Sequence, residues 1–227
     1  MNTDDQKRAA GEAGASLAQD GMVIGLGTGS TAAYFVRALA ARRLDVRGVA
    51  TSVGTETLAR SLGIVMLDLN DAPPIDLTVD GADEIGPGLS LIKGGGAALL
   101  REKLVWEASR RCVVIADAAK TMATLGEYPL PVEVIAFGHK TTARRIGAVL
   151  ESCAIAAAPA LRMKAGAPVA TDGGNLIYDL ACGAIPDPAR LAEALKRVTG
   201  VVEHGLFLGL AQLALIGMED GVAKLTP

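Results

Sequence analysis

The stretch MVIGLGTGST, residues 22–31, decides the fold, because a short apolar strand runs directly into a glycine-rich turn and then into a helical pattern reaching about Arg43. Outward from it the alternation continues, with strands expected at 46–50, 64–67, 76–79 and 112–116 and a helix at 54–62. Residues 3–19 also have helical spacing, with Thr3 as a candidate cap. Strands that alternate with helices predict an α/β fold with a parallel sheet covered on both faces.

The pattern changes near YPLP, residues 128–131. The elements expected after it are a strand at 132–136, a helix at 140–150, short strands to about 180, a helix at 188–198 and a strand at 200–203. Asp187 and Pro188 mark a helix start, as cap and first-turn proline. This order predicts a small inserted α+β domain of the ferredoxin-like kind. The expected domains are 1–128 with 204–227 and, between them, 129–203.

Composition narrows the class of protein. The 227 residues suffice for one large domain or two modest ones, and half of them are hydrophobic. The net charge of −3, with no basic run, argues against a nucleic-acid-binding surface. The polar N-terminus is unlike a signal peptide, and no apolar run approaches the roughly 20 residues of a membrane span. We expect a cytoplasmic protein with no nucleic-acid or membrane partner.

The cysteines and histidines argue against redox or metal chemistry. Cys112, Cys153 and Cys182 are scattered without a CxxC spacing and are expected to be reduced thiols. Only two histidines occur, His139 and His204, in different segments. A His-based metal site is therefore not expected.

The turn GLGTGST, residues 25–31, has the strand–turn–helix context that holds phosphate at a helix N-terminus. Thr28, Ser30 and Thr31 add hydroxyl donors. The turn is not the dinucleotide fingerprint, since the third glycine is missing, and no Walker lysine follows. The alternative is an ordinary tight turn with a Ser/Thr cap, and the turn alone leaves both open.

Three acids follow the expected strand 76–79 in the segment DGADE, residues 80–84. Open parallel sheets bind their ligands at this end of a strand. Asp80, Asp83 and Glu84 could bind a metal, hold hydroxyl groups or cap a helix. Capping by Asp83 or Glu84 is expected for at least one of them. A metal site would need more oxygen ligands than the sequence nominates.

The segment LIKGGGAALLREK, residues 91–103, combines a lysine, three glycines and a helix. Consecutive glycines let backbone amides approach a ligand closely, and the following helix terminus favours anions. Lys93 and Glu102 add a cation and a candidate base. The alternative is a solvated helix face on which Arg101, Lys103 and Glu107 form exposed pairs, but that leaves the glycines unexplained. The combination suits a small, anionic, oxygen-rich substrate.

Taken together, these segments resemble ribose-5-phosphate isomerase, type A. The motifs that carry the resemblance are GTGST (27–31), DGADE (80–84), LIKGGG (91–96), REK (101–103), Ala116-Asp117 with Lys120, LPVEV (130–134) and VEHGLF (202–207). They match in order and spacing over nearly the whole chain. Two positions depart from the family pattern: Ala119 stands where Ser is usual, and Gly173 where Asn is usual.

The resemblance implies a Rossmann-like domain and a smaller inserted domain. It also implies an aldose–ketose isomerase that interconverts D-ribose 5-phosphate and D-ribulose 5-phosphate through an enediolate. This reaction belongs to the non-oxidative branch of the pentose phosphate pathway. It implies Glu102 as the base, Lys93 as the oxyanion stabiliser, and Asp80 and Asp83 as holders of hydroxyls that assist ring opening. The residues implied in substrate binding are Thr28, Gly29, Ser30, Thr31, Asp80, Gly81, Ala82, Asp83, Lys93, Gly94, Gly95, Gly96 and Lys120. No metal or organic cofactor is implied, and a homodimer or homotetramer is expected. Which loop takes the phosphate stays open.

Two other classes of protein share some of these sequence features. A CoA-transferase-like enzyme also carries a Gly-Thr-Gly turn and a catalytic glutamate, but the short chain and the lysine before the glycines argue against it. A sugar-phosphate sensor domain of a transcription regulator would need a DNA-binding module, and the first 25 residues are too few for one.

Overall fold

The computed structural model describes residues 1–227, which group into two compact units. The first unit comprises Met1–Ala82, Arg101–Thr121 and Gly209–Pro227, and the second comprises Asp83–Leu100 and Met122–Leu208. These bounds differ from the expected domains, because the segments 83–100, 122–128 and 204–208 fall in the second unit. The positions at which folding domains end stay a prediction.

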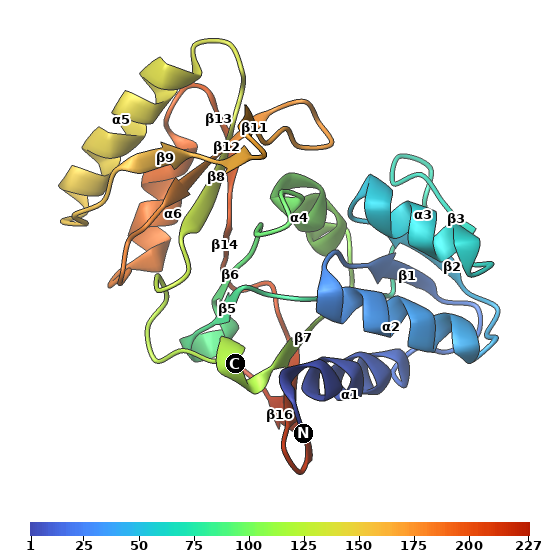
Figure 1. The fold of residues 1–227 in the computed structure, drawn as a ribbon. Helices are drawn as coiled ribbons and strands as arrows, with labels where there is room; N and C mark the ends of the chain where they lie inside the picture. The colour runs from blue at the N-terminus through green and yellow to red at the C-terminus, as the bar shows by residue number, and fades with distance from the viewer. The chain divides into compact units, whose positions relative to one another are not determined.

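The first unit is built on a seven-stranded sheet in the order β16-β15-β7-β4-β1-β2-β3 (Figure 1). Its strands are β1 (Val23–Leu26), β2 (Arg47–Ala50), β3 (Val65–Met66), β4 (Leu77–Asp80), β7 (Cys112–Asp117), β15 (Leu213–Met218) and β16 (Gly221–Leu225). Every neighbouring pair is parallel except β15–β16. Counting only the parallel strands, this is the Rossmann order 3-2-1-4-5-6, which confirms the predicted α/β class. The strand order reverses between β1 and β4, because β2 and β3 lie on one side of β1 and the later strands lie on the other.

Helices cover both faces of this sheet. Phe35 and Leu39 of α2 (Ser30–Ala41) pack with β1's Ile24 in a core that also includes residues of α1 (Thr3–Ala15) and α3 (Val53–Ser61). On the other face, Val105 of α4 (Leu99–Glu107) packs with Val23. Neighbouring residues of one strand point to opposite faces, so β1 fills both cores.

The start of α1 differs from the expectation. The side chain of Asn2, rather than that of Thr3, accepts a hydrogen bond from the amide of Asp5 at 2.9 Å. A cap residue must lie just outside the helix in extended conformation, which Asn2 does. The predicted cap at Thr3 was therefore wrong by one residue.

The second unit contains a ferredoxin-like layer, as predicted. Its elements in chain order are β8 (Leu130–Val134), α5 (His139–Ser152), β9 (Pro159–Leu161), β12 (Leu176–Leu180), α6 (Pro188–Lys196) and β13 (Val201–His204). The strands pair antiparallel in the order β13-β8-β12-β9. Val132 of β8 packs in one core with Ile146 of α5 and Leu191 of α6, so both helices cover the same face (Figure 1). Asp187 caps α6 by accepting from the amide of Arg190 at 3.0 Å, as expected.

Smaller elements complete this unit. They are a hairpin of β10 (Met163–Lys164) and β11 (Ala167–Pro168), a three-stranded sheet in the order β14 (Leu206–Phe207), β6 (Leu91–Ile92), β5 (Glu84–Ile85), and the 3-10 turn η1 (Pro87–Leu89). Asp83 directly precedes β5 and Lys93 directly follows β6. The amide of Asp83 donates to the carbonyl of Ile92, and the amide of Lys93 donates to the carbonyl of Gly205, so both residues are fixed to the three-stranded sheet.

No helix has the length and apolar character needed to cross a membrane. None of the three cysteines forms a disulfide bond.

Candidate active site

The turn after β1 and the end of β4 meet at the point where the strand order of the sheet reverses. The amide of Gly27 bonds the carbonyl of Val79 at 3.0 Å, and the amide of Thr28 bonds Asp80 Oδ1 at 3.0 Å. A Cβ on Gly27 would lie 2.2 Å from the same carboxylate oxygen, so this position requires glycine. Asp80 is fully buried, and Trp106 donates to its Oδ2 at 3.4 Å. Ligands of open α/β sheets bind at this switch point.

The hydroxyl of Thr28 lies inside a cluster of hydroxyl groups. It is within hydrogen-bond distance of Thr51 Oγ1 (2.7 Å), Ser52 Oγ (2.8 Å) and Thr55 Oγ1 (3.1 Å). The Thr55 hydroxyl also donates to the carbonyl of Gly27 at 2.9 Å. No sequence motif marked this cluster, although Thr51 and Ser52 follow β2 at the same end of the sheet. Its effect is to hold the turn in place from within the unit.

Ser30 and Thr31 lie instead at the start of α2, where the first amides of a helix have no intrahelical partner. Ser30 is exposed and Thr31 is half-buried. Gly29 precedes them with φ +112°, a conformation that side chains rarely adopt. A pocket of this unit is lined by Gly27, Thr28 and Gly29 together with residues of α2 and α3. The turn therefore presents amides and hydroxyls at a helix N-terminus, which suits an anion.

Two charged residues occupy the buried stripe of α4. Leu99, Glu102, Lys103 and Trp106 are all buried, at the i, i+3, i+4, i+7 spacing of an inward face. Glu102 is 3% exposed and Lys103 is 7% exposed. The alternative that Lys103 forms an exposed pair was wrong, because its position belongs to this inward stripe. Burying a carboxyl group is costly unless it is paired or hydrogen-bonded, and buried carboxyl groups are frequent at active sites, so Glu102 is a strong candidate for a functional acid or base.

Lys93 is held at the edge of the three-stranded sheet of the second unit. It is 2% exposed, and its ammonium lies 5.4 Å from the centre of the Phe207 ring, within range of a cation–π interaction. A Cβ on Gly205 would lie 2.2 Å from the carbonyl oxygen of Lys93. The segment VEHGLF, residues 202–207, thus supports Lys93. This supporting role is not evident from the sequence of the motif.

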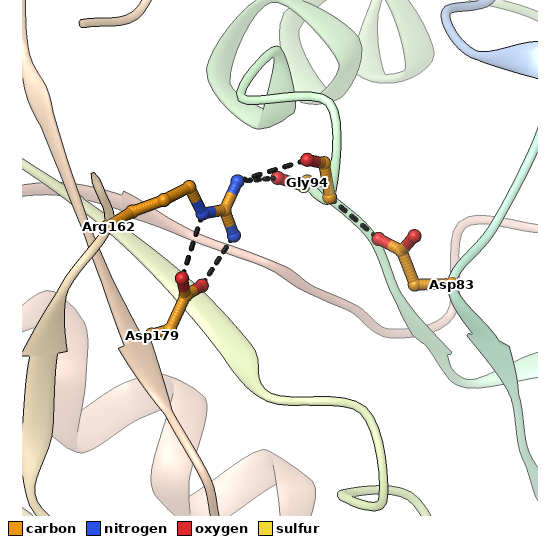
Figure 2. A network of polar contacts seen from close by, with 5 residues as sticks. Asp83, Gly94, Arg162 and Asp179 are labelled. Atoms are coloured by element: carbon orange, nitrogen blue, oxygen red, sulfur yellow. Dashed lines mark hydrogen bonds and ion pairs between the residues drawn. The ribbon is translucent and has the colours of Figure 1, made fainter. Parts of the chain in front are cut away.

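The glycine turn after Lys93 is fixed by charged side chains of the same unit. The amide of Gly95 donates to Asp83 Oδ2 at 2.8 Å, and Arg162 donates to the carbonyls of Gly94 and Gly95 (Figure 2). A Cβ on Gly95 would lie 2.6 Å from Asp83 Oδ1 and from the Tyr128 hydroxyl. Burial, followed by the charge of Asp83, raises the pKa of Tyr128. No sequence signal marked Tyr128 or Arg162.

Neither Asp83 nor Glu84 caps a helix, although the sequence predicts capping by at least one of them. Asp83 binds the Gly95 amide, and Glu84 is fully buried and accepts from the amides of Gly126 (2.7 Å) and Tyr128. The expectation was wrong because β5 follows them rather than a helix, so their carboxylates serve loop amides from other parts of the unit. No group of three or more His, Cys, Asp or Glu side chains is arranged to hold a metal ion.

The segment after β7 places Lys120 half-buried at the end of the short turn η2 (Ala118–Lys120). Asp117 caps this turn by accepting from the backbone amide of Ala119 at 3.2 Å. Because this hydrogen bond uses the backbone amide, it does not depend on whether Ala or the family's usual Ser stands at position 119. A Cβ at Gly173, the other departure, would make only ordinary contacts, the nearest with Asn175 at 3.5 Å.

The predicted site residues are divided between the two units. The first unit holds residues 28–31 and 80–82, with Glu102 and Lys120; the second holds Asp83 and residues 93–96. Within the first unit the structure brings Thr28 to Asp80, and within the second it brings Gly95 of the glycine turn to Asp83.

A Rossmann-ordered sheet with a glycine turn at its switch point and buried acids defines an enzyme of the α/β class that binds a small anionic ligand. The sequence model of the family described as ribose 5-phosphate isomerase A (phosphoriboisomerase A) matches residues 47–221. The chain belongs to this family.

Individual relatives agree with that assignment. A ribose-5-phosphate isomerase A of Caulobacter sp. (strain K31) is 64% identical, with 100% of both chains covered. The crystal structure of ribose 5-phosphate isomerase A from Neisseria gonorrhoeae has a TM-score of 0.92 at 33% identity, covering 100% of this chain and 98% of that one. A D-ribose-5-phosphate isomerase in complex with phospho-erythronic acid has a TM-score of 0.92 at 37% identity and 100% coverage of both chains. The chain is therefore an isomerase that interconverts ribose 5-phosphate and ribulose 5-phosphate in the pentose phosphate pathway.

Proposed function

We propose that Glu102 is the base that moves a proton between C1 and C2 of the open-chain sugar phosphate. The carboxylate would remove the proton next to the carbonyl, giving an enediolate, and return it to the neighbouring carbon. The observation that carries this proposal is a carboxylate only 3% exposed, in the first turn of α4 and in the buried stripe of that helix. One group can serve both steps, because the proton leaves and returns on one face.

Lys93 is proposed to stabilise the oxyanion of the enediolate. A buried cation acts most strongly where water is excluded, and Lys93 is 2% exposed and held by its backbone. Asp80 and Asp83 are proposed to hold sugar hydroxyls and to assist opening of the furanose ring. The proton balance then closes within the sugar and these side chains, so we propose that neither a metal nor an organic cofactor takes part.

The phosphate is proposed to bind at Gly29, Ser30 and Thr31, with Lys120 as a further cation. The start of α2 offers amides that have no intrahelical partner, and the helix dipole favours an anion there. The remaining substrate contacts are proposed for the backbones of 81–82 and 94–96, with Thr28 chiefly supporting its own turn. The finer expectations of a cytoplasmic location and of a homodimer or homotetramer also remain proposals.

The test is Glu102→Gln against Glu107→Gln, which alters an exposed carboxylate on the same helix. Gln keeps the shape but cannot accept the carbon proton, so turnover of ribose 5-phosphate should fall by about 10⁴-fold or more. Binding of phospho-erythronic acid, which is a carboxylic acid rather than an aldose or ketose and so cannot be isomerised, should change by only a few-fold. Glu107→Gln should match the wild type in both measurements. Near wild-type turnover by Glu102→Gln would place the base elsewhere.

A further inference from the structure

An ion pair of the second unit lies directly beside the glycine turn (Figure 2). Arg162 donates from Nε to Asp179 Oδ2 at 2.8 Å and from Nη2 to Asp179 Oδ1. Its remaining terminal nitrogen, Nη1, donates to the carbonyl of Gly94 at 2.8 Å and to that of Gly95 at 3.1 Å. One planar guanidinium thus binds a carboxylate on one edge and two backbone carbonyls on the other.

The ion pair is anchored in the sheet. The backbone amide of Arg162 bonds the carbonyl of Ile177 in β12, and its carbonyl accepts from Val169. Asp179 lies in β12, paired with Ala160 on one side and with Pro131 on the other. The Arg162 side chain is only 14% exposed. Burial lowers its pKa, but the hydrogen bonds and charge of Asp179 raise it more, so the pKa lies above its ordinary value and the group stays charged.

The turn that receives these bonds has little to restrict its own backbone. Consecutive glycines have no side chains to restrict them. Gly94 has φ +106°, and the Gly95 amide donates to Asp83 Oδ2 on the side of the turn away from Arg162 (Figure 2). The guanidinium therefore sets the planes of the peptides whose amide orients Asp83.

We propose that Arg162, oriented by Asp179, is a positioning residue for the isomerase reaction: it fixes the turn at Gly94–Gly95 so that Asp83 meets the sugar in one orientation. This inference rests on the proposed role of Asp83. Arg162 acts through the turn and does not itself touch substrate. A misplacement of about 1 Å at a reacting group can lower the rate by about 10²-fold, so the turn's position matters even though its own atoms do not react.

The experiment compares Arg162→Met and Arg162→Lys with Arg197→Met, which removes an arginine from an exposed ion pair with Glu193 on α6. For ribose 5-phosphate, Arg162→Met should lower kcat/KM by about 10- to 10²-fold. Arg162→Lys should recover part of this loss, because an ammonium keeps the charge but not the fork. Arg197→Met should match the wild type. Unchanged kcat/KM in Arg162→Met would overturn the proposal.

Hydrogen exchange separates positioning from simple unfolding. In Arg162→Met, the amides of residues 94–97 should exchange faster, while those of β8 and β12 keep their protection. Loss of protection throughout the unit would mean that Arg162 serves stability only, which contradicts the proposal. This readout does not depend on which substrate the protein converts.

A double-mutant cycle with Asp83→Ala tests the route of the effect. If Arg162 acts through Asp83, the double variant should be no more than a few-fold worse than Asp83→Ala alone. Independent, multiplying losses would refute that route. Wild-type kcat/KM in Asp83→Ala alone would instead contradict the proposed role of Asp83, so the two failures can be told apart.

Discussion

The two glycine-rich turns look alike in the sequence but are supported in opposite ways. The turn at 27–31 is held by neutral hydroxyl groups, those of Thr28, Thr51, Ser52 and Thr55, and it leads directly into α2. The turn at 94–96 is held by the ion pair of Arg162 and Asp179 and by Asp83. Each turn gives one amide to an aspartate, but only the first opens straight onto the N-terminus of a long helix.

This difference supports the different roles that we propose for the two turns. A dianion gains from helix-start amides and hydroxyls, so the first turn suits the phosphate. In the second turn the carbonyls of Gly94 and Gly95 already bind Arg162 and the Gly95 amide binds Asp83, so these backbone groups are engaged within the protein. The second turn is thus suited to orienting Asp83 toward sugar hydroxyls.

The largest effect is expected in the second turn. Gly95→Ala would place a Cβ 2.6 Å from both Asp83 Oδ1 and the Tyr128 hydroxyl, so the turn or the aspartate must shift. We expect kcat/KM for ribose 5-phosphate to fall by roughly 10²-fold. Gly147→Ala, in α5 of the same unit, meets nothing closer than 3.9 Å and should leave kcat/KM unchanged. Wild-type kinetics in Gly95→Ala would show that the turn tolerates movement.

A smaller effect, on stability, is expected in the first turn. Thr28→Val keeps the shape but removes the hydroxyl that meets three others, and should lower the free energy of unfolding by about 1–3 kcal/mol. Thr28→Ser keeps the hydroxyl and should lose less. Denaturant unfolding of the three proteins measures this. Equal stability of wild type and Thr28→Val would mean that the cluster does not hold the turn.

The smallest effect is a pH dependence confined to the second turn. The pKa of Tyr128 is raised by burial and by Asp83, so the folded protein retains the phenol proton more tightly than the unfolded chain. Its contribution to stability is complete below about pH 10 and is lost as pH rises through the higher folded pKa. Melting temperatures between pH 9 and 11 should fall less in Tyr128→Phe than in wild type. Equal falls would exclude a contribution from Tyr128.

The sequence was most informative where a feature is local. The strand, turn and start of α2 are contiguous, so their order predicted both the parallel sheet and the glycine turn at a helix N-terminus. Asp187 and Pro188 marked the start of α6 in the same way. The ferredoxin-like order followed from the succession of elements alone.

Features built from distant segments were not predictable. Arg162 is 68 residues from Gly94, and nothing in its surroundings in sequence marks it as a partner of the turn. At least one of Asp83 and Glu84 was expected to cap a helix, but the partners of Glu84 lie more than 40 residues away. The alternative of an exposed Lys103 followed from its charged side chain, whereas its position in the inward stripe of α4 explains why it is buried.

The most direct test of the account measures the preference for ribose 5-phosphate over free ribose, as a ratio of kcat/KM values, in three proteins. A charge-assisted phosphate site contributing about 4 kcal/mol gives the wild type a ratio on the order of 10³. In Ser30→Ala/Thr31→Val the ratio should shrink by at least about 10-fold, because the phosphate loses donors. In Gly95→Ala both substrates should be converted more slowly and the ratio should stay as in wild type. A ratio unchanged by the first variant and reduced by Gly95→Ala would place the phosphate at the second turn and contradict the account.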